Sequence, residues 1–199
     1  KADVSNASIT KIDYRPFDCR FIPYSCNSKG ILSYPRYDVM QHMINHENVA
    51  LVMTKQLSTF DFQHAFVTRN ISDKCTVSSQ TKEAGYHFPL YLYHDDGTKV
   101  PNLDQTIWSK INETAGETEP EDVLDYIYAV LHSPNYREKY KEFLKIDFPR
   151  VPYPKDKNVF NKLVKLGREL RGLHLLESEK VNKFITTFPV GGSSLVEKK

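Results

Sequence analysis

The pattern of apolar residues changes near residue 97, and this change constrains the fold more than any other feature of the sequence. Before it, five short runs rich in Val, Ile, Phe and Tyr are bounded by Asn, Asp, Ser, Gly or Pro, which is typical of β-strands. These runs are residues 8–14, 19–24, 48–55, 65–71 and 87–93. After it, apolar residues recur at helical spacing. The sequence therefore predicts a mixed α/β fold of the α+β kind, with a β-rich subdomain over residues 1–101 and a helical region over residues 102–199.

Helix signals are present in both halves. Residues 37–44 have helical spacing inside the β-rich half, and residues 103–114 form the first candidate of the second half. Later helices are expected behind a capping box of Thr118 and Glu121, behind Ser133 and Pro134, and from Lys157 onward. Residues 147–154 contain three prolines and are expected to be extended. Residues 181–190 are predicted to form a final strand, and residues 191–199 a tail.

The last helix has a seam of apolar residues at intervals of four and three, formed by Val159, Leu163, Leu166, Leu170 and Leu173. This spacing favours a helix that faces a partner helix. Packing on the preceding helices is favoured, and a protein–protein interaction module without DNA binding remains the alternative function. Gly167 and Gly172 each destabilise this helix by roughly 1 kcal/mol relative to Ala, which indicates close backbone packing or fraying.

Composition excludes two broad classes of protein. No apolar run approaches the roughly 18–20 residues of a membrane span, and 12% aromatic residues without a low-complexity tract argue against disorder. Three cysteines (Cys19, Cys26 and Cys75) are too few for a disulfide scaffold, which favours a reducing compartment such as the cytoplasm. Because the chain starts at Lys1 rather than Met, we expect a piece of a longer polypeptide.

Motifs of a complete enzyme are missing from the sequence. It has no G-x-S-x-G nucleophile elbow and no glycine-rich phosphate loop. His42 and His46 are four residues apart, but no Glu follows His42 as in zinc proteases, so zinc is not expected. A hydrolase that uses one of His42, His46 or His64 with Asp61 is the second alternative. We expect no catalytic residue, metal or cofactor in this chain.

Short motifs along the chain match one known family in the same order. They include Tyr14-Arg15-Pro16-Phe17-Asp18-Cys19-Arg20, then Tyr34-Pro35-Arg36 leading into residues 39–43, and residues 64–69 and 88–93. The longest runs over residues 131–152, from L-H-S-P-N-Y-R to D-F-P-R-V-P, and residues 166–176 complete the set. The chain thereby resembles the large single-polypeptide restriction–modification enzymes of type ISP and the related type IIG.

This resemblance implies the C-terminal DNA target-recognition domain, which follows an adenine-N6 methyltransferase in that family. The expected function is sequence-specific recognition of double-stranded DNA. The expected partners are this DNA and the methyltransferase, and possibly nuclease and helicase domains, of the same polypeptide. S-adenosylmethionine is expected for the parent enzyme only, since the methyltransferase N-P-P-Y loop is missing here. Arg15, Arg20 and Arg150 lie in shared motifs and are expected to stabilise the fold through carboxylates, with Asp18 and Asp147 as candidates.

Loops of the β-rich half supply the candidate DNA contacts. The net charge of +2 is weak support for nucleic-acid binding, so the prediction depends on clusters of basic, amide and hydroxyl side chains. Such side chains pair with base edges or phosphates. The residues expected to read bases are Arg36, Gln41, Lys55, Gln56, Arg69 and Gln80, and those expected to contact phosphates are Lys29, Lys74 and Lys82.

Overall fold

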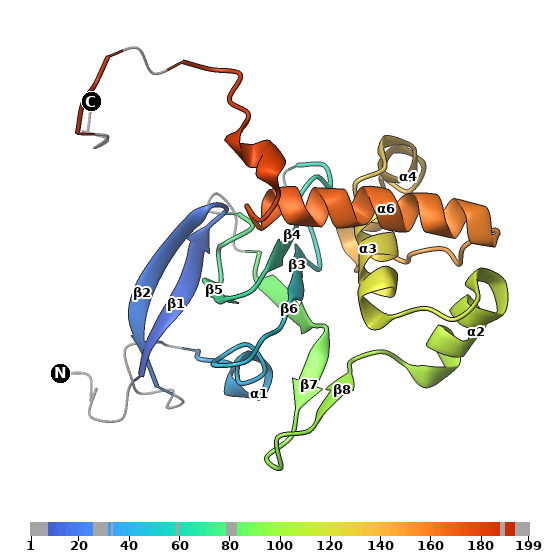
Figure 1. The fold of residues 1–199 in the computed structure, drawn as a ribbon, viewed down its shortest axis with the longest axis horizontal. Helices are drawn as coiled ribbons and strands as arrows, with labels where there is room; N and C mark the ends of the chain where they lie inside the picture. The colour runs from blue at the N-terminus through green and yellow to red at the C-terminus, as the bar shows by residue number, and fades with distance from the viewer. Residues whose placement is uncertain are drawn as a thin grey trace.

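The N-terminal half of the chain forms three small sheets (Figure 1). The computed structural model describes residues 8–25, 32, 34–58, 60–78, 83–187 and 190–193. In the first sheet, β1 (Ser8–Arg15) and β2 (Asp18–Tyr24) form an antiparallel hairpin, and β5 (Ile71–Ser72) pairs with β1 in parallel. In the second sheet, β3 (Ala50–Thr54) lies between β4 (Ala65–Thr68) and β6 (Gly85–Pro89). The third consists of β7 (Tyr91–Tyr93) and β8 (Lys99–Pro101).

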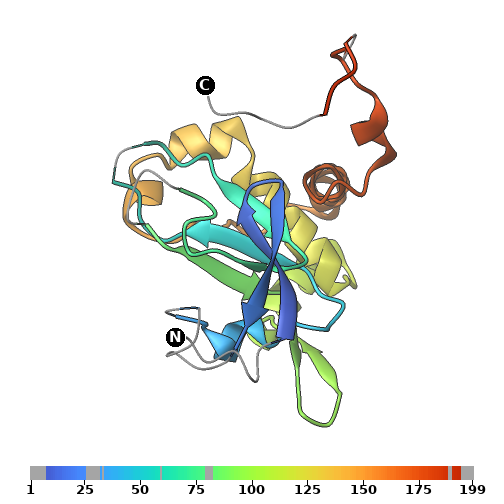
Figure 2. The ribbon, with the colours of Figure 1, turned by 90° about the vertical axis from the view of Figure 1, so that its left-hand side faces the viewer.

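Helices dominate the second half, which confirms the predicted mixed fold. They are α2 (Gln105–Ala115), α3 (Pro120–Leu131), α4 (Pro134–Lys139), α5 (Phe143–Ile146) and α6 (Lys157–His174), followed by a 3-10 turn at Glu179–Asn182. The short α1 (Tyr37–Met40) belongs to the first half. Figure 2 shows α6 end-on, with the β1–β2 hairpin crossing in front of the second sheet.

One strand, β3, connects the two halves because it is buried on both faces. Leu51 and Met53 point into a core shared with Leu124 and Leu131 of α3. Ala50, which precedes Leu51 on the opposite face of the strand, belongs to a second core with residues of the hairpin and β5. Alternate residues of a strand point to opposite faces, so β3 packs against the helices on one face and against the first sheet on the other.

The helices α3 and α6 approach each other unusually closely at Gly167. A Cβ atom added there would lie 1.9 Å from the backbone oxygen of Asp125. The Asp125 side chain is fully buried, and its carboxylate accepts hydrogen bonds from Arg171 at 2.6 and 3.0 Å and from Arg168 at 3.3 Å. The predicted close backbone packing is thus confirmed at Gly167, where no other residue type fits.

This close approach sets which face of α6 is buried, and the predicted seam is correct only in part. The buried residues are Phe160, Val164 and Gly167. Of the seam, Leu163 and Leu170 are half-buried against the core, whereas Val159 and Leu166 are exposed. Packing of α6 on the preceding helices, the favoured reading, is confirmed. The helix is rotated relative to the prediction because the row that contains the glycine must face α3.

Several other boundaries differ from the predictions. The run 65–71 is interrupted after Thr68, and its parts β4 and β5 enter different sheets. The run 87–93 is interrupted at Leu90, and the helix predicted over residues 37–44 ends at Met40 and continues as turns to residue 45. The strand predicted over residues 181–190 is wrong in its described part, because residues 179–182 form a 3-10 turn and residues 183–187 are not in a strand.

The helix signals were more accurate. Ser133 accepts from the backbone N–H of Tyr136 as the N-cap of α4, as predicted. The capping box of α3 lies one residue later than predicted and consists of Glu119 and Asp122. The hydroxyl of Thr118 is engaged elsewhere, because it accepts from Trp108 Nε1 and donates to Asn112.

Candidate nucleic-acid interface

Three predicted DNA-contact residues converge on one groove of about 540 Å³. We call it the lysine groove; its lining includes Lys55, Gln56, Lys74, Tyr86 and Lys145. One carboxylate, that of Glu83, also lines it and accepts from the backbone N–H and the hydroxyl of Ser58. Lys55 and Gln56 follow the buried strand β3, Lys74 follows β5, Tyr86 belongs to β6 and Lys145 belongs to α5. The three segments of the β half are joined to one another, because β6 pairs with β3 and because Ile71 of β5 packs with Ala50 of β3.

The lysines of this groove are neutralised to different degrees. Lys55 Nζ lies 3.8 Å from Asp147, and Lys145 Nζ lies 3.2 Å from Glu142 and 3.6 Å from Asp61. The ammonium group of Lys74 has no ion pair within the described part of the chain. Exposed pairs of this kind contribute at most about 1 kcal/mol, so a phosphate group can displace the carboxylates.

Aromatic side chains form one wall beside the lysines. The ring of Phe148 contacts Tyr86 and Phe88 edge-on, with centroids 5.1 and 5.4 Å apart, and Lys55 Nζ lies 5.8 Å from the Phe148 centroid. Gln56 donates to the backbone oxygen of Ile146 at 3.4 Å. Interleaved cations and aromatic rings suit a nucleic acid, since they offer contacts to both phosphates and bases.

Two further predicted residues lie near α1, away from the lysine groove. Arg36 precedes α1 in a left-handed backbone conformation with φ of 49°, and its carbonyl accepts from the N–H groups of Val39 and Met40. Gln41 donates from Nε2 to the carbonyl of Asp38 at 3.3 Å. This segment leads into the start of β3, whereas Lys55 follows its end (Figure 1). The side chain of Arg36 is exposed.

Arg69 is engaged with the segment that follows α6. Its guanidinium forms a two-point ion pair with Glu177, and Nη1 lies 3.4 Å from the carbonyl of Asn48. The hydrogen bond raises the pKa of Arg69 and lowers the pKa of Glu177. Base reading by Arg69 would require this pair to open. The remaining predicted residues, Lys29, Gln80 and Lys82, lie outside the described residues.

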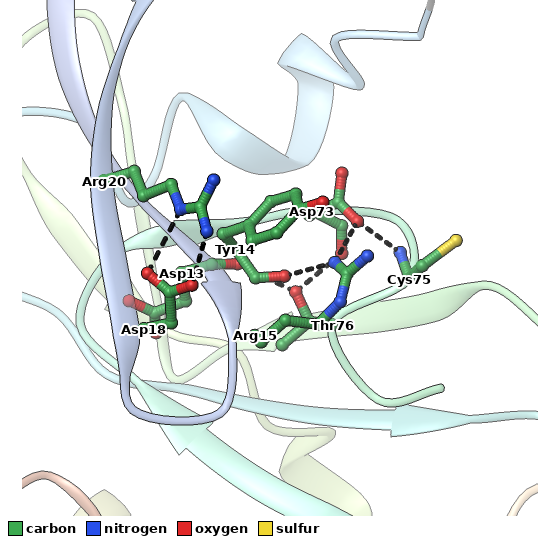
Figure 3. Close-up of polar contacts among 8 residues, drawn as sticks. All are labelled: Asp13, Tyr14, Arg15, Asp18, Arg20, Asp73, Cys75 and Thr76. Atoms are coloured by element: carbon green, nitrogen blue, oxygen red, sulfur yellow. Dashed lines mark hydrogen bonds and ion pairs between the residues drawn. The ribbon is translucent and has the colours of Figure 1, made fainter. Parts of the chain in front are cut away.

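The motif shared with the restriction enzymes forms a cluster of arginines around Tyr14 (Figure 3). The guanidinium carbons of Arg15 and Arg20 each lie 4.0 Å from the Tyr14 ring centroid, a distance typical of cation–π contacts. Arg20 forms two hydrogen bonds with Asp18, at 3.1 and 2.8 Å, which confirms Asp18 as a carboxylate partner of one of the three arginines. These hydrogen bonds hold the pKa of Asp18 below its usual range.

The second candidate carboxylate, Asp147, pairs with none of the three arginines in the described part of the chain, and Arg15 uses a carboxylate that the sequence did not single out. Arg15 pairs at 2.9 Å with Asp73, because the parallel pairing of β1 with β5 brings the two together across 58 residues of sequence. Asp147 pairs with Lys55 rather than with Arg150. The backbone carbonyl of Arg150 accepts from the hydroxyl of Tyr136 at 3.0 Å.

The histidines considered for catalysis have other contacts. His42 Nδ1 accepts from the backbone N–H of Tyr93 at 3.0 Å, and His46 stacks on the Tyr93 ring with centroids 3.9 Å apart. Asp61, the carboxylate considered as a partner for one of His42, His46 or His64, pairs instead with Lys141 at 2.9 Å. In the part of the chain that the structure describes, no group of His, Cys, Asp and Glu is arranged to hold a metal ion. None of its described helices is both long and apolar enough to cross a membrane.

Sequence reasoning missed Lys145, Tyr86 and Phe148. Lys145 and Phe148 are more than 50 residues from any β-strand that lines the groove, so only the fold brings them to it. The one available signal was the D-F-P-R motif, whose first two residues, Asp147 and Phe148, lie beside Lys55.

The chain matches the family described as Type ISP C-terminal specificity domain over residues 1–199, and it belongs to that family. Solved structures that resemble it include the following two. One is a cryo-EM structure of a DrdV–DNA complex, with 28% identity and a TM-score of 0.70 over 87% of this chain and 16% of that chain. The other is a nuclease-deletion mutant of the Type ISP restriction-modification enzyme LlaGI in complex with a DNA substrate mimic. It has 27% identity and a TM-score of 0.64 over 88% of this chain and 14% of that chain. Among curated protein sequences, none matches.

Proposed function

We propose that the chain is the double-stranded DNA target-recognition module of a restriction–modification enzyme and that the lysine groove contacts the duplex. One observation carries this proposal: Lys55, Gln56 and Lys74 converge with Lys145 on a single groove, in a chain whose structural relatives were solved with DNA. Lysines neutralise phosphates irrespective of sequence, while an amide such as that of Gln56 pairs with adenine.

The activity of the whole enzyme is a further part of the proposal. The chain spans about one-sixth of the DrdV chain and about one-seventh of the LlaGI chain, so catalytic domains belong to the rest of such a polypeptide. We propose that the parent is a cytoplasmic adenine-N6 methyltransferase that uses S-adenosylmethionine. Methylation of adenine requires the base to be flipped from the duplex, and a recognition module on a rigid fold would hold the flanking DNA in place.

The separate roles of the two parts of the chain in DNA binding are also a prediction. We propose that residues 1–101 make most DNA contacts and that residues 102–199 support them and couple them to the other domains. Lys145 is then a contribution of the helical region to the groove. Arg36 and Gln41 are proposed as a second set of contacts near α1, and Lys29, Gln80 and Lys82 stay candidates from sequence alone.

The proposal is tested by the salt dependence of DNA binding. Replacing Lys55, Lys74 and Lys145 together by Ala removes up to three phosphate contacts, so the slope of log K against log salt should fall by up to about 2.7, at about 0.9 per contact. The matched control is Lys165→Ala, which removes an exposed lysine of α6 that does not line the groove. An unchanged slope in the triple variant would refute the groove as the interface.

Base reading is tested separately with Gln56→Ala. This variant should alter which sequences are selected from a randomised duplex library by about 1–3 kcal/mol at one base pair, with little change in the salt slope. A uniform loss of affinity over all sequences would contradict a reading role for Gln56.

A further inference from the structure

We infer that Arg15 is a positioning residue for DNA binding: through its ion pair with Asp73 it holds the loop that presents Lys74 to the lysine groove. This inference rests on the proposed function of that groove. Arg15 does not itself line the groove, so the effect that we infer passes through the loop rather than through a direct contact. Of the three groove lysines, Lys74 is the one whose ammonium is not already paired within the described residues.

The loop begins where β5 ends, and it is fastened to β1 at its first residue (Figure 3). The backbone N–H of Asp73 donates to the carbonyl of Asp13 at 3.0 Å. Its carboxylate oxygen Oδ1 accepts from Arg15 Nη1 at 2.9 Å and from the backbone N–H of Cys75 at 2.9 Å. One carboxylate thus ties the strand to both sides of Lys74.

A second set of contacts fixes the backbone of Lys74 from the opposite side. Its carbonyl accepts from the N–H of Gly85 at 2.8 Å, at the start of β6. The hydroxyl of Thr76 lies 2.8 Å from the carbonyl oxygens of both Asp13 and Asp73. The main chain around Lys74 is thus hydrogen-bonded to β1 and β6, and its exposed side chain lines the groove.

The same motif contains a natural comparison, Arg20. Both arginines stack on the Tyr14 ring at 4.0 Å, and both have a carboxylate partner. The partner of Arg20, however, is Asp18 on the same hairpin, so its loss leaves the anchors of the Lys74 loop intact. Arg20→Ala therefore removes one positive charge and one cation–π contact without touching the loop.

The test is a double-mutant cycle read out as the salt slope of binding to a mixed-sequence DNA duplex. Lys74→Ala should lower the slope by about 0.9, which corresponds to about eightfold weaker binding at 0.1 M salt. Arg15→Ala should lower the slope by most of the roughly 0.9 that Lys74 contributes. The Arg15→Ala/Lys74→Ala double variant should bind no more weakly than Lys74→Ala alone. Arg15→Lys keeps an ion pair with Asp73 and should restore the slope. The changes in binding free energy caused by Arg20→Ala and by Lys74→Ala should be additive.

Independent losses for Arg15→Ala and Lys74→Ala would overturn the inference while leaving the groove in place, because Arg15 would then act through its own charge. An unchanged slope in Lys74→Ala would overturn the groove assignment itself. Thermal unfolding shows whether Arg15→Ala folds. If it does not, Asp73→Ala tests the same inference. That variant makes the protein more positive, so charge alone predicts tighter DNA binding, whereas loss of the loop anchor predicts weaker binding.

Discussion

Replacing Gly167 by Ala tests whether the contact between α3 and α6 determines the stability of the fold. The new Cβ would lie 1.9 Å from the backbone oxygen of Asp125, and real Cβ atoms essentially never approach such an atom within 3.0 Å. The helices must therefore separate by at least about 1.1 Å, the difference between these two distances. Neither side of the contact is a flexible side chain that can turn away.

Separation of the helices has two further consequences. It draws Arg171 away from the buried Asp125, which now accepts at 2.6 and 3.0 Å, and it loosens the packing of Phe160 and Val164. Overpacking of this kind destabilises by about 1–3 kcal/mol, and weakening of a buried ion pair adds to it. The intrinsic gain of Ala over Gly in a helix, about 1 kcal/mol, offsets only part. We expect a net loss of about 2–4 kcal/mol in the free energy of unfolding.

Gly172, in the last turns of the same helix, is the matched control. The nearest atom to its added Cβ is Ser178 Cβ at 3.7 Å, an ordinary contact. Gly172→Ala should therefore be neutral or stabilise by up to about 1 kcal/mol. Urea unfolding of both variants measures the difference, provided the m-value stays unchanged. Equal stability of the two variants would refute the reasoning, since their helix propensities change alike.

Two further predictions concern buried titratable groups. Burial lowers the pKa of His87 from its ordinary 6.5 to about 4, so the folded state favours the neutral ring. The contribution of this ring to the free energy of unfolding is therefore fully present above pH 6.5. It is lost as the pH falls toward 4, by up to about 1.4 kcal/mol per pH unit. In His87→Asn, the difference between the free energies of unfolding at pH 7 and pH 5 should be about 2 kcal/mol smaller than in the unaltered protein. The same difference in both proteins would contradict this account. Asp125→Ala leaves Arg171 buried without its carboxylate and should destabilise by about 3–5 kcal/mol, measured by urea unfolding; a loss below about 1 kcal/mol would show that water replaces the carboxylate.

Features encoded by neighbouring residues were predictable, and features created by the fold were not. The N-cap at Ser133 and the Asp18–Arg20 pair lie within a few residues of sequence, and both are present. The partner of Arg15 is 58 residues away, so its choice depends on a parallel strand pairing that no local pattern encodes. The buried face of α6 likewise depends on Gly167, because backbone contact outweighs the heptad spacing of leucines.

The candidate site follows the same rule. Lys55, Gln56 and Lys74 were identified as basic or amide residues on loops, which is a property of the sequence alone. Their convergence requires β3 to be buried on both faces, because the face that carries Ala50 packs with Ile71 of β5 and thereby holds the loop after β5 near the end of β3. Lys145 joins them only because the chain returns to β3, where Leu57 N–H donates to the carbonyl of Lys145 at 2.9 Å.

The carboxylates around the groove have a consequence for how DNA is selected. Asp147 and Glu142 already neutralise Lys55 and Lys145, so a phosphate must displace them and the net gain from each contact is small. If the groove binds DNA as proposed, a duplex of the wrong sequence gains mainly the contact of Lys74, whose ammonium has no ion pair within the described residues. Weak phosphate contacts reduce binding to non-target DNA, and they leave discrimination to side chains that read bases, for which Gln56, a lining residue of the same groove, is the candidate.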